Sequence, residues 1–366
     1  MIQKISLTHF KAYEEEEFNI APLTLIAGIN GMGKSSILQS LLMLRQSYDV
    51  DYLNKSEKQI RLNGHFVNLE NSDVLCYSMA EDRHVIVSIE TCKGIHTWKI
   101  DAQTPEETNP SCTYEGDDFK SISLFSKTME FLTAERVGPR TEYKTESSKA
   151  YNTPLGIQGE LTPAYLFHSL QRNELIGTEN MQFSDMIDNQ LINNVNAWMS
   201  WIMSMKINTY TSATDPQNVK LEYSFDGVWN HFSALQVGFG LSFVLPVIAA
   251  LLKAKKGDLI LIENPEAHLH PSAQVKLGKM IGKAVANGIQ VILETHSDHL
   301  LNGIRLARKE GLLKYDDVNL IFVQRKTING QLVTFTNEIQ ITDNGKLTDR
   351  PSLFFDTWED TLVKLI

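Results

Sequence analysis

The chain has 366 residues and a formal net charge of −10, from 34 Lys and Arg against 44 Asp and Glu. Non-specific nucleic-acid binding relies on Lys and Arg contacts to phosphate, so this balance argues against a protein built mainly for that purpose. Hydrophobic residues form 42% and charged residues 21% of the sequence, which indicates a globular protein with a sizeable core rather than a disordered one.

Neither the cysteines nor the apolar stretches point to secretion or to a membrane. Cys76, Cys92 and Cys112 are far apart and lack the paired spacing of a metal site, so we expect free thiols in a reducing compartment. The N-terminus has no apolar signal core. The most apolar stretch, residues 239–252, is too short to span a bilayer and predicts a buried helix. We therefore expect a cytoplasmic protein without a membrane span.

The first fifty residues predict strands, a glycine-rich turn and a helix, in that order. Residues 2–7 alternate as a strand, residues 18–20 are its expected partner, and residues 23–27 form a short apolar strand. After the turn, apolar residues at helical spacing predict a helix over 35–45.

The middle of the chain changes character near residue 140. Residues 60–135 are β-rich, with the clearest strands over 85–89 and 131–134. Residues 140–215 contain helix-compatible runs and few strand patterns, which predicts an inserted helical region.

Two hairpins are expected in the last third. Asp226-Gly227 lies between strand patterns over 221–225 and 228–232. Strand–helix alternation then resumes up to residue 300, and Asn329-Gly330 marks the second hairpin. The strands of that hairpin are expected over 320–323 and 332–335. No sustained heptad run is present, so a long coiled coil is excluded.

Residues 28–35, Gly-Ile-Asn-Gly-Met-Gly-Lys-Ser, match the phosphate-binding loop pattern at every fixed position. The glycines let successive backbone N–H groups face the phosphates. Lys34 adds a positive charge toward the β- and γ-phosphates, and the Ser35 hydroxyl is a ligand for Mg²⁺. We expect ATP and Mg²⁺ as cofactors, with nucleotide contacts from Asn30, Gly31, Met32, Gly33, Lys34, Ser35 and Ser36.

Two later strands carry polar residues at their ends. The apolar run 259–262 ends in Glu263, which we expect to hold Mg²⁺ through a water, although a solvated acid at a strand end is the plainer alternative. The strand pattern over 290–294 is followed by His296, which could donate a hydrogen bond to the γ-phosphate or be structural.

The four histidines in these stretches allow a second interpretation, a transition-metal site. Both His-x-His and His-x-x-His spacings occur, but no cysteine or carboxylate set accompanies them. We therefore favour the nucleotide interpretation. The residues concerned are His268, His270, His296 and His299.

With these elements in order, the chain resembles the ABC-type ATPases related to SMC and OLD-family proteins. The resemblance is carried by residues 7–11, 131–140, 236–242 and 263–271. The tail, with Phe354-Phe355-Asp356, resembles an uncharacterised C-terminal module of the same proteins. Within this group the chain is similar to PtuA-type ATPases of Septu systems, which accompany a nuclease in phage-defence operons.

The resemblance implies an α/β fold, an ABC-type ATPase head of two lobes with a mixed β-sheet core. It further implies an inserted helical region and a small C-terminal α/β extension. The expected division is an N-terminal lobe with the phosphate loop and a β-rich arm over 1–139, the helical insertion over 140–217, the second lobe over 218–300, and the extension over 301–366.

In this family a signature motif from a second copy caps the γ-phosphate. The resemblance assigns that role to Gly238, Gly240 and Ser242, and implies a head-to-tail dimer around ATP. A helix N-terminus with small residues can approach an anion closely, in agreement with this role.

The sequence departs from an active ABC ATPase at two places. Asn264 stands where the family has a glutamate that positions the attacking water, and an amide cannot accept the proton. Glu266, two positions on, could substitute for it. Phe243 follows Ser242 where the signature usually has glutamine. We therefore expect slow hydrolysis, with Glu263, Asn264, Glu266 and His296 as the catalytic set.

The leading hypothesis is an ATP-dependent switch: ATP closes a dimer, hydrolysis opens it, and a separate effector such as an HNH or TOPRIM-type nuclease responds. The alternative is an SMC/RecF-like DNA repair or maintenance ATPase, which the acidic balance disfavours. A nuclease fused to an ATPase would need a further acidic cluster with metal spacing, and we find none in the sequence.

Overall fold

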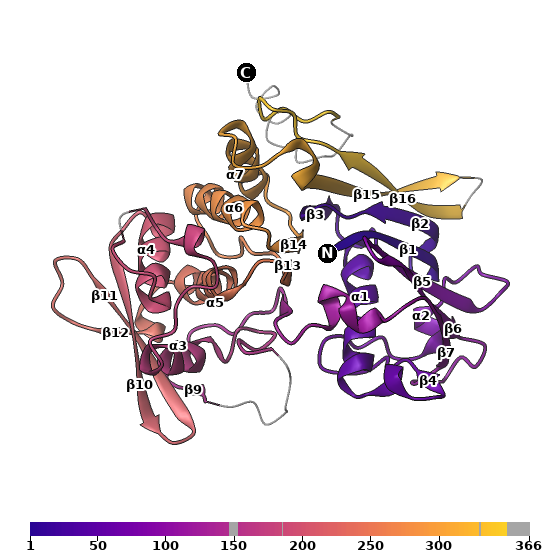
Figure 1. Ribbon diagram of the computed structural model, residues 1–366, viewed down its shortest axis with the longest axis horizontal. Coiled ribbons are helices and arrows are strands. Elements are labelled where there is room, and N and C mark those ends of the chain that lie inside the picture. The colour runs from indigo at the N-terminus through magenta and orange to yellow at the C-terminus, as the bar shows by residue number, and fades with distance from the viewer. Residues whose placement is uncertain (146–152, 185, 329–330, 350–366) are drawn as a thin grey trace. The chain divides into compact units, whose positions relative to one another are not determined.

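The computed structural model describes residues 1–145, 153–184, 186–328 and 331–349 (Figure 1). The described residues form two compact units. Unit 1 comprises Met1–Lys127, Val318–Gln340 and the described residues from Leu347. Unit 2 comprises Thr128–Asp317 and Ile341–Lys346.

Unit 1 contains an antiparallel sheet in the order β2-β1-β5-β6-β7-β4. Along β1, buried and partly exposed residues alternate, as expected for a strand with one face on the core. Ile5 pairs with Phe18 on one side and with Ile89 on the other, so these apolar side chains share that face. The strands are β1 (Ile2–Phe10), β2 (Tyr13–Asn19), β4 (Lys58–Gln59), β5 (His84–Thr91), β6 (Gly94–Asp101) and β7 (Ser111–Glu115).

Unit 1 also contains β3 (Leu23–Gly28), which runs parallel to β15 (Val318–Ile328) and is buried nearly throughout. β15 pairs antiparallel with β16 (Gln331–Ile339), which confirms the second hairpin. Its expected turn, Asn329-Gly330, lies outside the described residues, as does Phe354-Phe355-Asp356. The unit's helical segments are α1 (Lys34–Asp49), η1 (Tyr52–Asn54), α2 (Ser72–Leu75), η2 (Phe119–Ser121) and η3 (Ser123–Phe125).

Unit 2 has β13 (Leu259–Glu263) between β14 (Gln290–Glu294) and β8 (Glu130–Leu132), all parallel. In this register Glu263 lies beside Glu294, so two carboxylates stand at neighbouring strand ends. The strand expected over 131–134 ends at Leu132 because Thr133 and Ala134 turn to bond the Glu263 carboxylate instead. Unit 2 also contains three helices near these strands in the sequence: α5 (Phe239–Lys253), α6 (Pro271–Ala286) and α7 (Asp298–Lys309).

Glycines allow α6 and α7 to pack closely. A Cβ added at Gly278 would lie 2.3 Å from the Leu300 carbonyl oxygen, and one at Gly303 would lie 2.1 Å from the Val275 carbonyl oxygen. Larger residues at either position would therefore force the two helices apart. This packing fixes the helices that follow β13 and β14, and with them the chain segments at those strand ends.

The region expected to be helical contains α3 (Thr162–Gln171), η4 (Glu179–Met181) and α4 (Leu191–Met203), but it also contains strands. Its last nine residues form β10 (Ile207–Asp215), so the expectation of helix up to residue 215 was wrong there. β-branched Ile and Thr residues in β10 favour a strand. β10 belongs to a small sheet in the order β10-β11-β12, with β9 (Tyr143–Lys144) paired to β11 (Asn218–Phe225).

The first hairpin is formed with a longer loop than expected. β12 is only Phe232–Ser233, and Phe232 pairs with Tyr223 of β11. The strand expected over 228–232 was therefore wrong for residues 228–231, which lie in the connection, with Trp229 almost fully exposed. The loop widens because the chain leaves the ladder after Val228, whose N–H bonds the Phe225 carbonyl in a turn.

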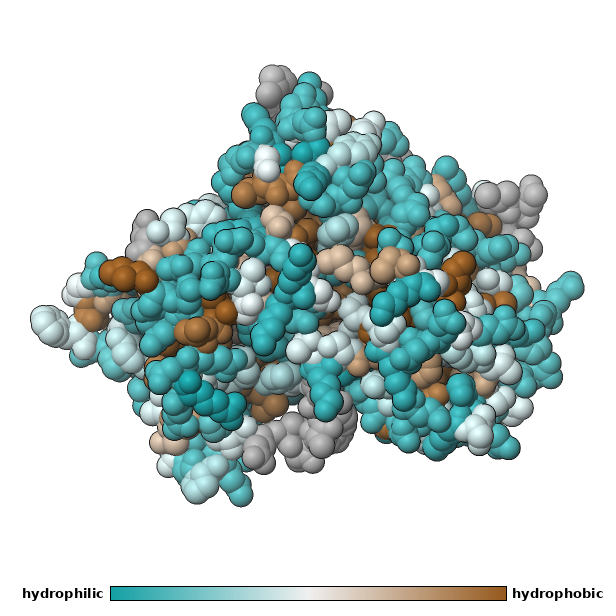
Figure 2. Space-filling view, in the orientation of Figure 1, coloured by the Kyte–Doolittle hydropathy of each residue, from teal (hydrophilic) through white to brown (hydrophobic). Residues whose placement is uncertain are grey.

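The surface is mostly polar on the face drawn in Figure 2, where hydrophobic residues occur in small separate groups. The apolar stretch 239–252 forms the buried helix α5, as expected. Among the described residues, no helix combines the length and the hydrophobicity needed to cross a bilayer.

Candidate nucleotide site

The phosphate loop links β3 to α1 in unit 1, in the strand–loop–helix context that the motif requires. Gly28, Gly31 and Gly33 have φ values of 139°, 76° and 106°, which other residues adopt only with strain. A Cβ at Gly28 would lie 2.3 Å from the Val323 carbonyl oxygen of β15. Both the turn and the close approach therefore require glycine.

Lys34 begins α1 and lies against the loop. It is 4% exposed, and its Nζ donates to the Ile29 carbonyl at 2.9 Å. Gly33 has no room for a side chain, because an added Cβ would lie 2.9 Å from Cβ of Ala12. The Tyr13 hydroxyl donates to the Gly33 carbonyl at 3.0 Å, so the first residue of β2 is hydrogen-bonded to the loop.

This loop fits a nucleotide phosphate. Ile29, Asn30 and Gly31 are exposed, and Gly31 has open space where a Cβ would stand. The N-terminus of α1 follows the loop directly and carries the positive end of the helix dipole. Met32, Ser35 and Ser36 lie at this same junction of loop and helix. The Ser35 hydroxyl is an oxygen ligand of the kind that Mg²⁺ binds.

In unit 2, Glu263 ends β13 and one of its oxygens is already bonded. Its Oε2 accepts from the Ala134 N–H at 3.0 Å and from the Thr133 hydroxyl at 3.1 Å. These bonds fix the orientation of the carboxylate and leave Oε1 as the oxygen that can face a hydrated Mg²⁺.

The turn after Glu263, residues 263–268, is called here the acidic turn, and Asn264 adopts φ 44° within it. The Asn264 N–H donates to the Glu294 carbonyl at 2.8 Å, which ties the turn to the end of β14. Its Oδ1 is buried and has no hydrogen-bond partner within the described residues. Asparagine adopts this left-handed conformation more readily than glutamate, so the backbone here favours the residue that is present.

Glu266 lies inside unit 2, with 8% of its surface exposed. Its Oε1 accepts from the His296 N–H at 2.9 Å, and burial raises the pKa of the carboxyl group. Its Oε2 is buried and lacks a partner among the described residues. The structure thus brings together Glu263, Asn264, Glu266 and the backbone of His296 at the ends of β13 and β14.

Arg136 joins these residues and was not singled out by the sequence. It is 3% exposed, and its Nη1 donates to the carbonyls of Glu263 at 2.8 Å and Thr133 at 3.2 Å. Its Nη2 donates to the Asn264 carbonyl. Burial lowers the pKa of this guanidinium to about 10, so it stays protonated at neutral pH. The sequence signals for it were its position four residues after a buried strand end and its place in the stretch 131–140 that carries the family resemblance.

The proposed signature residues begin α5, and they differ in exposure. Gly238 is exposed, and a Cβ there would meet nothing within 4 Å. A Cβ at Gly240 would lie 2.8 Å from the His268 carbonyl oxygen, so Gly240 permits contact with the acidic turn. Ser242 is 6% exposed and faces the tyrosines Tyr143 and Tyr223. Its hydroxyl oxygen is buried and has no hydrogen-bond partner within the described residues.

The histidines do not gather into a metal site. His268 packs against Phe239 and Phe243, and His270 caps α6 by accepting from the Ser272 N–H. His299 lies near Asp298. Across the described ranges, no group of three or more His, Cys, Asp or Glu side chains could hold a metal ion.

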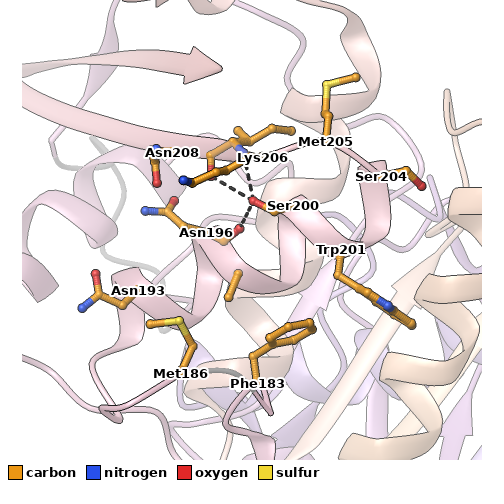
Figure 3. Close-up of a pocket in the computed structure, with 12 residues that line it drawn as sticks. Phe183, Met186, Asn193, Asn196, Ser200, Trp201, Ser204, Met205, Lys206 and Asn208 are labelled. Atoms are coloured by element: carbon orange, nitrogen blue, oxygen red, sulfur yellow. Dashed lines mark hydrogen bonds between the residues drawn. The ribbon is translucent and has the colours of Figure 1, made fainter. Parts of the chain in front are cut away.

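A groove of about 640 Å³ lies elsewhere in unit 2, between α4, the loop around Phe183 and the start of β10 (Figure 3). Among its lining residues, the Ser200 hydroxyl lies within hydrogen-bond distance of the carbonyls of Asn196 and Ile207 and accepts from the Ile207 N–H. The groove shares no residue with the acidic turn. α4 lines it with Asn193, Asn196, Ala197, Ser200 and Trp201, and Ser204 follows at the end of the helix.

Sequence profiles of known families agree with the site. The profile described as "AAA ATPase domain" matches residues 1–127, and the AAA_21 profile, described as "AAA domain, putative AbiEii toxin, Type IV TA system", matches residues 111–302. The protein is an ATPase of this AAA type and binds ATP. The second match covers 192 of 366 residues, and the chain belongs to the AAA_21 family.

Two further comparisons concern the tail and the whole chain. Residues 313–365 match a family of unknown function, DUF3696, in agreement with the expected C-terminal module. The chain is 21% identical over 342 residues to the OLD nuclease of Thermus scotoductus, covering 85% of this chain. It spans 62% of the length of that relative.

Solved structures show the same mixed α/β fold as an SMC head. The chain matches an SMC head bound to the C-terminal winged-helix domain of ScpA, with a TM-score of 0.55 and 13% identity over 92% of this chain and 98% of the other. It matches the SMC head with an extended coiled coil from Pyrococcus furiosus, bound to the C-terminal domain of ScpA, with a TM-score of 0.53 and 12% identity over 100% and 99%. These likenesses confirm the expected fold class.

Proposed function

We propose that this ATPase is a slow nucleotide-dependent switch that dimerises head to tail around ATP and Mg²⁺ and controls a separate effector protein. The observation that carries the proposal is the contrast between a complete phosphate loop and an acidic turn without a general base at Asn264. A protein of this kind binds ATP well and releases it as ADP slowly. The two states can then persist long enough for a partner to respond.

ATP binding through residues 30–36 is supported by the geometry of the loop. The glycines hold backbone N–H groups at the N-terminus of α1, and Lys34 contributes the charge that pairs with phosphate. In the proposal Ser35 binds Mg²⁺ directly and Glu263 binds it through a water.

Slow hydrolysis is supported by the residues of the acidic turn. An amide at position 264 cannot accept a proton from water, and general-base assistance is worth about 10² to 10⁴ in rate. Glu266 is the nearest replacement, but its Oε1 is engaged by the His296 N–H and its pKa is raised by burial. We propose that Glu266 accepts the proton inefficiently and that the His296 side chain contacts the γ-phosphate.

Dimerisation through the start of α5 is supported by its exposure. Phe239 is 56% exposed and Gly238 has open space around it, so a second copy's nucleotide can approach this helix N-terminus. The proposal assigns the cap to Gly238, Gly240 and Ser242, and because Ser242 is only 6% exposed, its hydroxyl reaches the phosphate only if the start of α5 moves.

The effector is proposed from the likeness of the family. The longer relative, of which this chain spans 62%, is described as a nuclease. We propose that a separate nuclease, encoded beside this ATPase in a phage-defence operon, has the corresponding role. A neighbouring reading frame for such a nuclease would support this part of the proposal.

The decisive experiment measures mass by native mass spectrometry with ATP, with ADP and without nucleotide, for the wild type and Gly238→Asp. We expect ATP-dependent dimers in the wild type. The variant should bind ATP normally but dimerise about 10³-fold more weakly, because like charges about 4 Å apart repel by about 4 kcal/mol at an effective dielectric constant of 20.

The matched control is Leu170→Asp, which adds the same charge at an exposed position of α3 in the same unit. It should dimerise like the wild type. A wild type that stays monomeric with ATP, or a Gly238→Asp variant that forms normal dimers, would contradict the proposed head-to-tail arrangement. Adding the neighbouring nuclease to the same measurement tests whether the dimer is the form that it binds.

A further inference from the structure

The segment after β8, residues 133–138, contacts both the acidic turn and the start of α5. Thr133 and Ala134 bond the Glu263 carboxylate, as described above. At its other end, an added Cβ at Gly138 would lie 3.2 Å from the Phe239 ring. One short stretch of chain therefore touches the proposed magnesium carboxylate and the helix that would meet a second copy.

Arg136 is at the centre of this segment. Its guanidinium donates to the carbonyls of Glu263 and Asn264, the first two residues of the turn. The planar fork of arginine can bond both carbonyls at once, which a single ammonium group cannot do in the same geometry. Because Asn264 has a left-handed backbone, this pair of bonds helps to hold a peptide that would otherwise relax.

The other side of Arg136 faces α5. The centre of its guanidinium lies 5.7 Å from the centroid of the Phe243 ring, within the range of a cation–π contact. The same ring lies 4.4 Å from the His268 ring, at the end of the acidic turn. A shift of the Phe243 ring would therefore change its contacts with both Arg136 and His268 of the acidic turn.

We propose that Arg136 is a positioning residue that sets the acidic turn for hydrolysis and transmits movement at the start of α5 to Glu263 and Asn264. The inference rests on the proposed function, since it concerns the hydrolysis step of that ATPase. Engagement of Gly238 and Phe239 by a second copy moves α5 against Arg136, and Arg136 moves the carbonyls at the end of β13. Hydrolysis is thereby linked to dimer formation through contacts inside unit 2.

The first test compares Arg136→Lys and Arg136→Ala with the wild type in single-turnover hydrolysis at excess protein. Both variants should keep their ATP affinity, because Arg136 bonds residues 133, 263 and 264 and is not among the residues proposed to bind ATP. Their hydrolysis rate should fall about 10²-fold, the typical cost of misplacing a reacting group by about 1 Å. Free guanidinium at millimolar concentration should restore part of the rate of Arg136→Ala. Arg140→Ala, an exposed arginine four residues on, is the matched control and should be unchanged.

The second test is a double-mutant cycle between Arg136→Lys and Phe243→Leu, measured on the same rate. Phe243 contacts neither carboxylate, so a link through Arg136 predicts that the double variant loses much less than the product of the single effects. Additive effects within about twofold would overturn the proposed link. A loss of rate in Arg136→Ala that guanidinium does not restore, with a parallel loss of folded protein, would overturn the positioning role.

These outcomes are distinct from failure of the proposed function. A wild type that binds no ATP would overturn the proposed function and this inference with it. A wild type that binds and hydrolyses ATP, alongside an Arg136→Lys variant of equal rate, would overturn this inference alone.

Discussion

The phosphate loop of unit 1 and the acidic turn of unit 2 obtain unusual backbone conformations in opposite ways. In the loop, glycines take the positive φ values, and the backbone itself forms the binding surface. In the turn, Asn264 and His268 take positive φ values, and hydrogen bonds from distant parts of the chain hold the backbone of Asn264. Arg136 does so from about 130 residues earlier in the chain, and Glu294 and the end of β14 from 30 residues later.

The difference has a consequence for substitution. The loop depends on the conformational freedom of its own residues, so single changes away from it should leave it intact. The turn depends on a set of bonds that share Arg136 and Glu266, so changes there should act together rather than independently. The following predictions test this contrast.

The largest effect is expected for Lys34→Ala in the loop. ATP affinity should fall about 10²-fold, because a charge-assisted bond to phosphate contributes about 1.5 to 3 kcal/mol. The free energy of unfolding should change little, because the bond from Nζ to the Ile29 carbonyl lies within the same loop. Equilibrium binding of a fluorescent ATP analogue measures the first quantity, and urea denaturation measures the second.

Lys4→Ala serves as the control for that prediction, since Lys4 is a partly exposed lysine of unit 1 paired with Glu17. It should bind ATP like the wild type. Retained affinity in Lys34→Ala would remove the basis for assigning the loop to phosphate.

An intermediate effect is expected for Asn264→Glu in the turn. A glutamate here restores a proton acceptor and should raise turnover, by up to about 10²-fold if the water position is otherwise intact. The left-handed backbone should cost this variant about 1 kcal/mol of stability. Steady-state phosphate release and thermal denaturation measure the two effects.

Asn264→Gly is the matched variant, because it accepts the same backbone conformation without adding an acceptor. It should keep the slow wild-type turnover. If wild-type turnover without a partner already equals that of vigorous ABC ATPases, the site has another base and the contrast between loop and turn fails.

The smallest effect is expected for Glu266→Gln and appears in the pH dependence of stability. Burial raises the pKa of Glu266 above its unfolded value, so folding favours the protonated form. The wild type should therefore lose stability as the pH rises from the ordinary glutamate pKa through the raised one, whereas the variant should not.

The measurement is the difference in unfolding free energy between Glu266→Gln and the wild type, from about pH 4 to pH 8. It should grow in favour of the variant with increasing pH. A difference that is flat with pH would mean that Glu266 is ionised without penalty and is free to act as an efficient base.

The contrast also explains which parts of the site could be predicted. The phosphate loop was recognisable because its glycines, lysine and serine are consecutive and their roles are local. Glu263 and His296 could be proposed from strand ends alone. The role of Arg136 could not be proposed in this way, because it depends on hydrogen bonds to the carbonyls of residues 263 and 264. No local sequence pattern indicates that these residues lie together.

The role of Ser242 stays a prediction for a related reason. A glycine–serine helix start indicates an anion site, but whether the hydroxyl points outward depends on the partners of α5 inside the unit. Here Tyr143 and Tyr223 lie on the inner side, and the hydroxyl faces them. Gly240, likewise, is needed for its contact with the His268 carbonyl as well as for any contact with a second copy.

The sequence by itself determined the strand–loop–helix unit at residues 23–49, the buried strands that end in Glu263 and Glu294, and the class of protein. These features depend on hydrophobic periodicity and on glycine, which act over a few residues. Only the tertiary structure decided that β10 is a strand and that Ser242 is buried. It alone showed Arg136 joining the acidic turn to α5, because packing and hydrogen bonding between distant segments override local preference there.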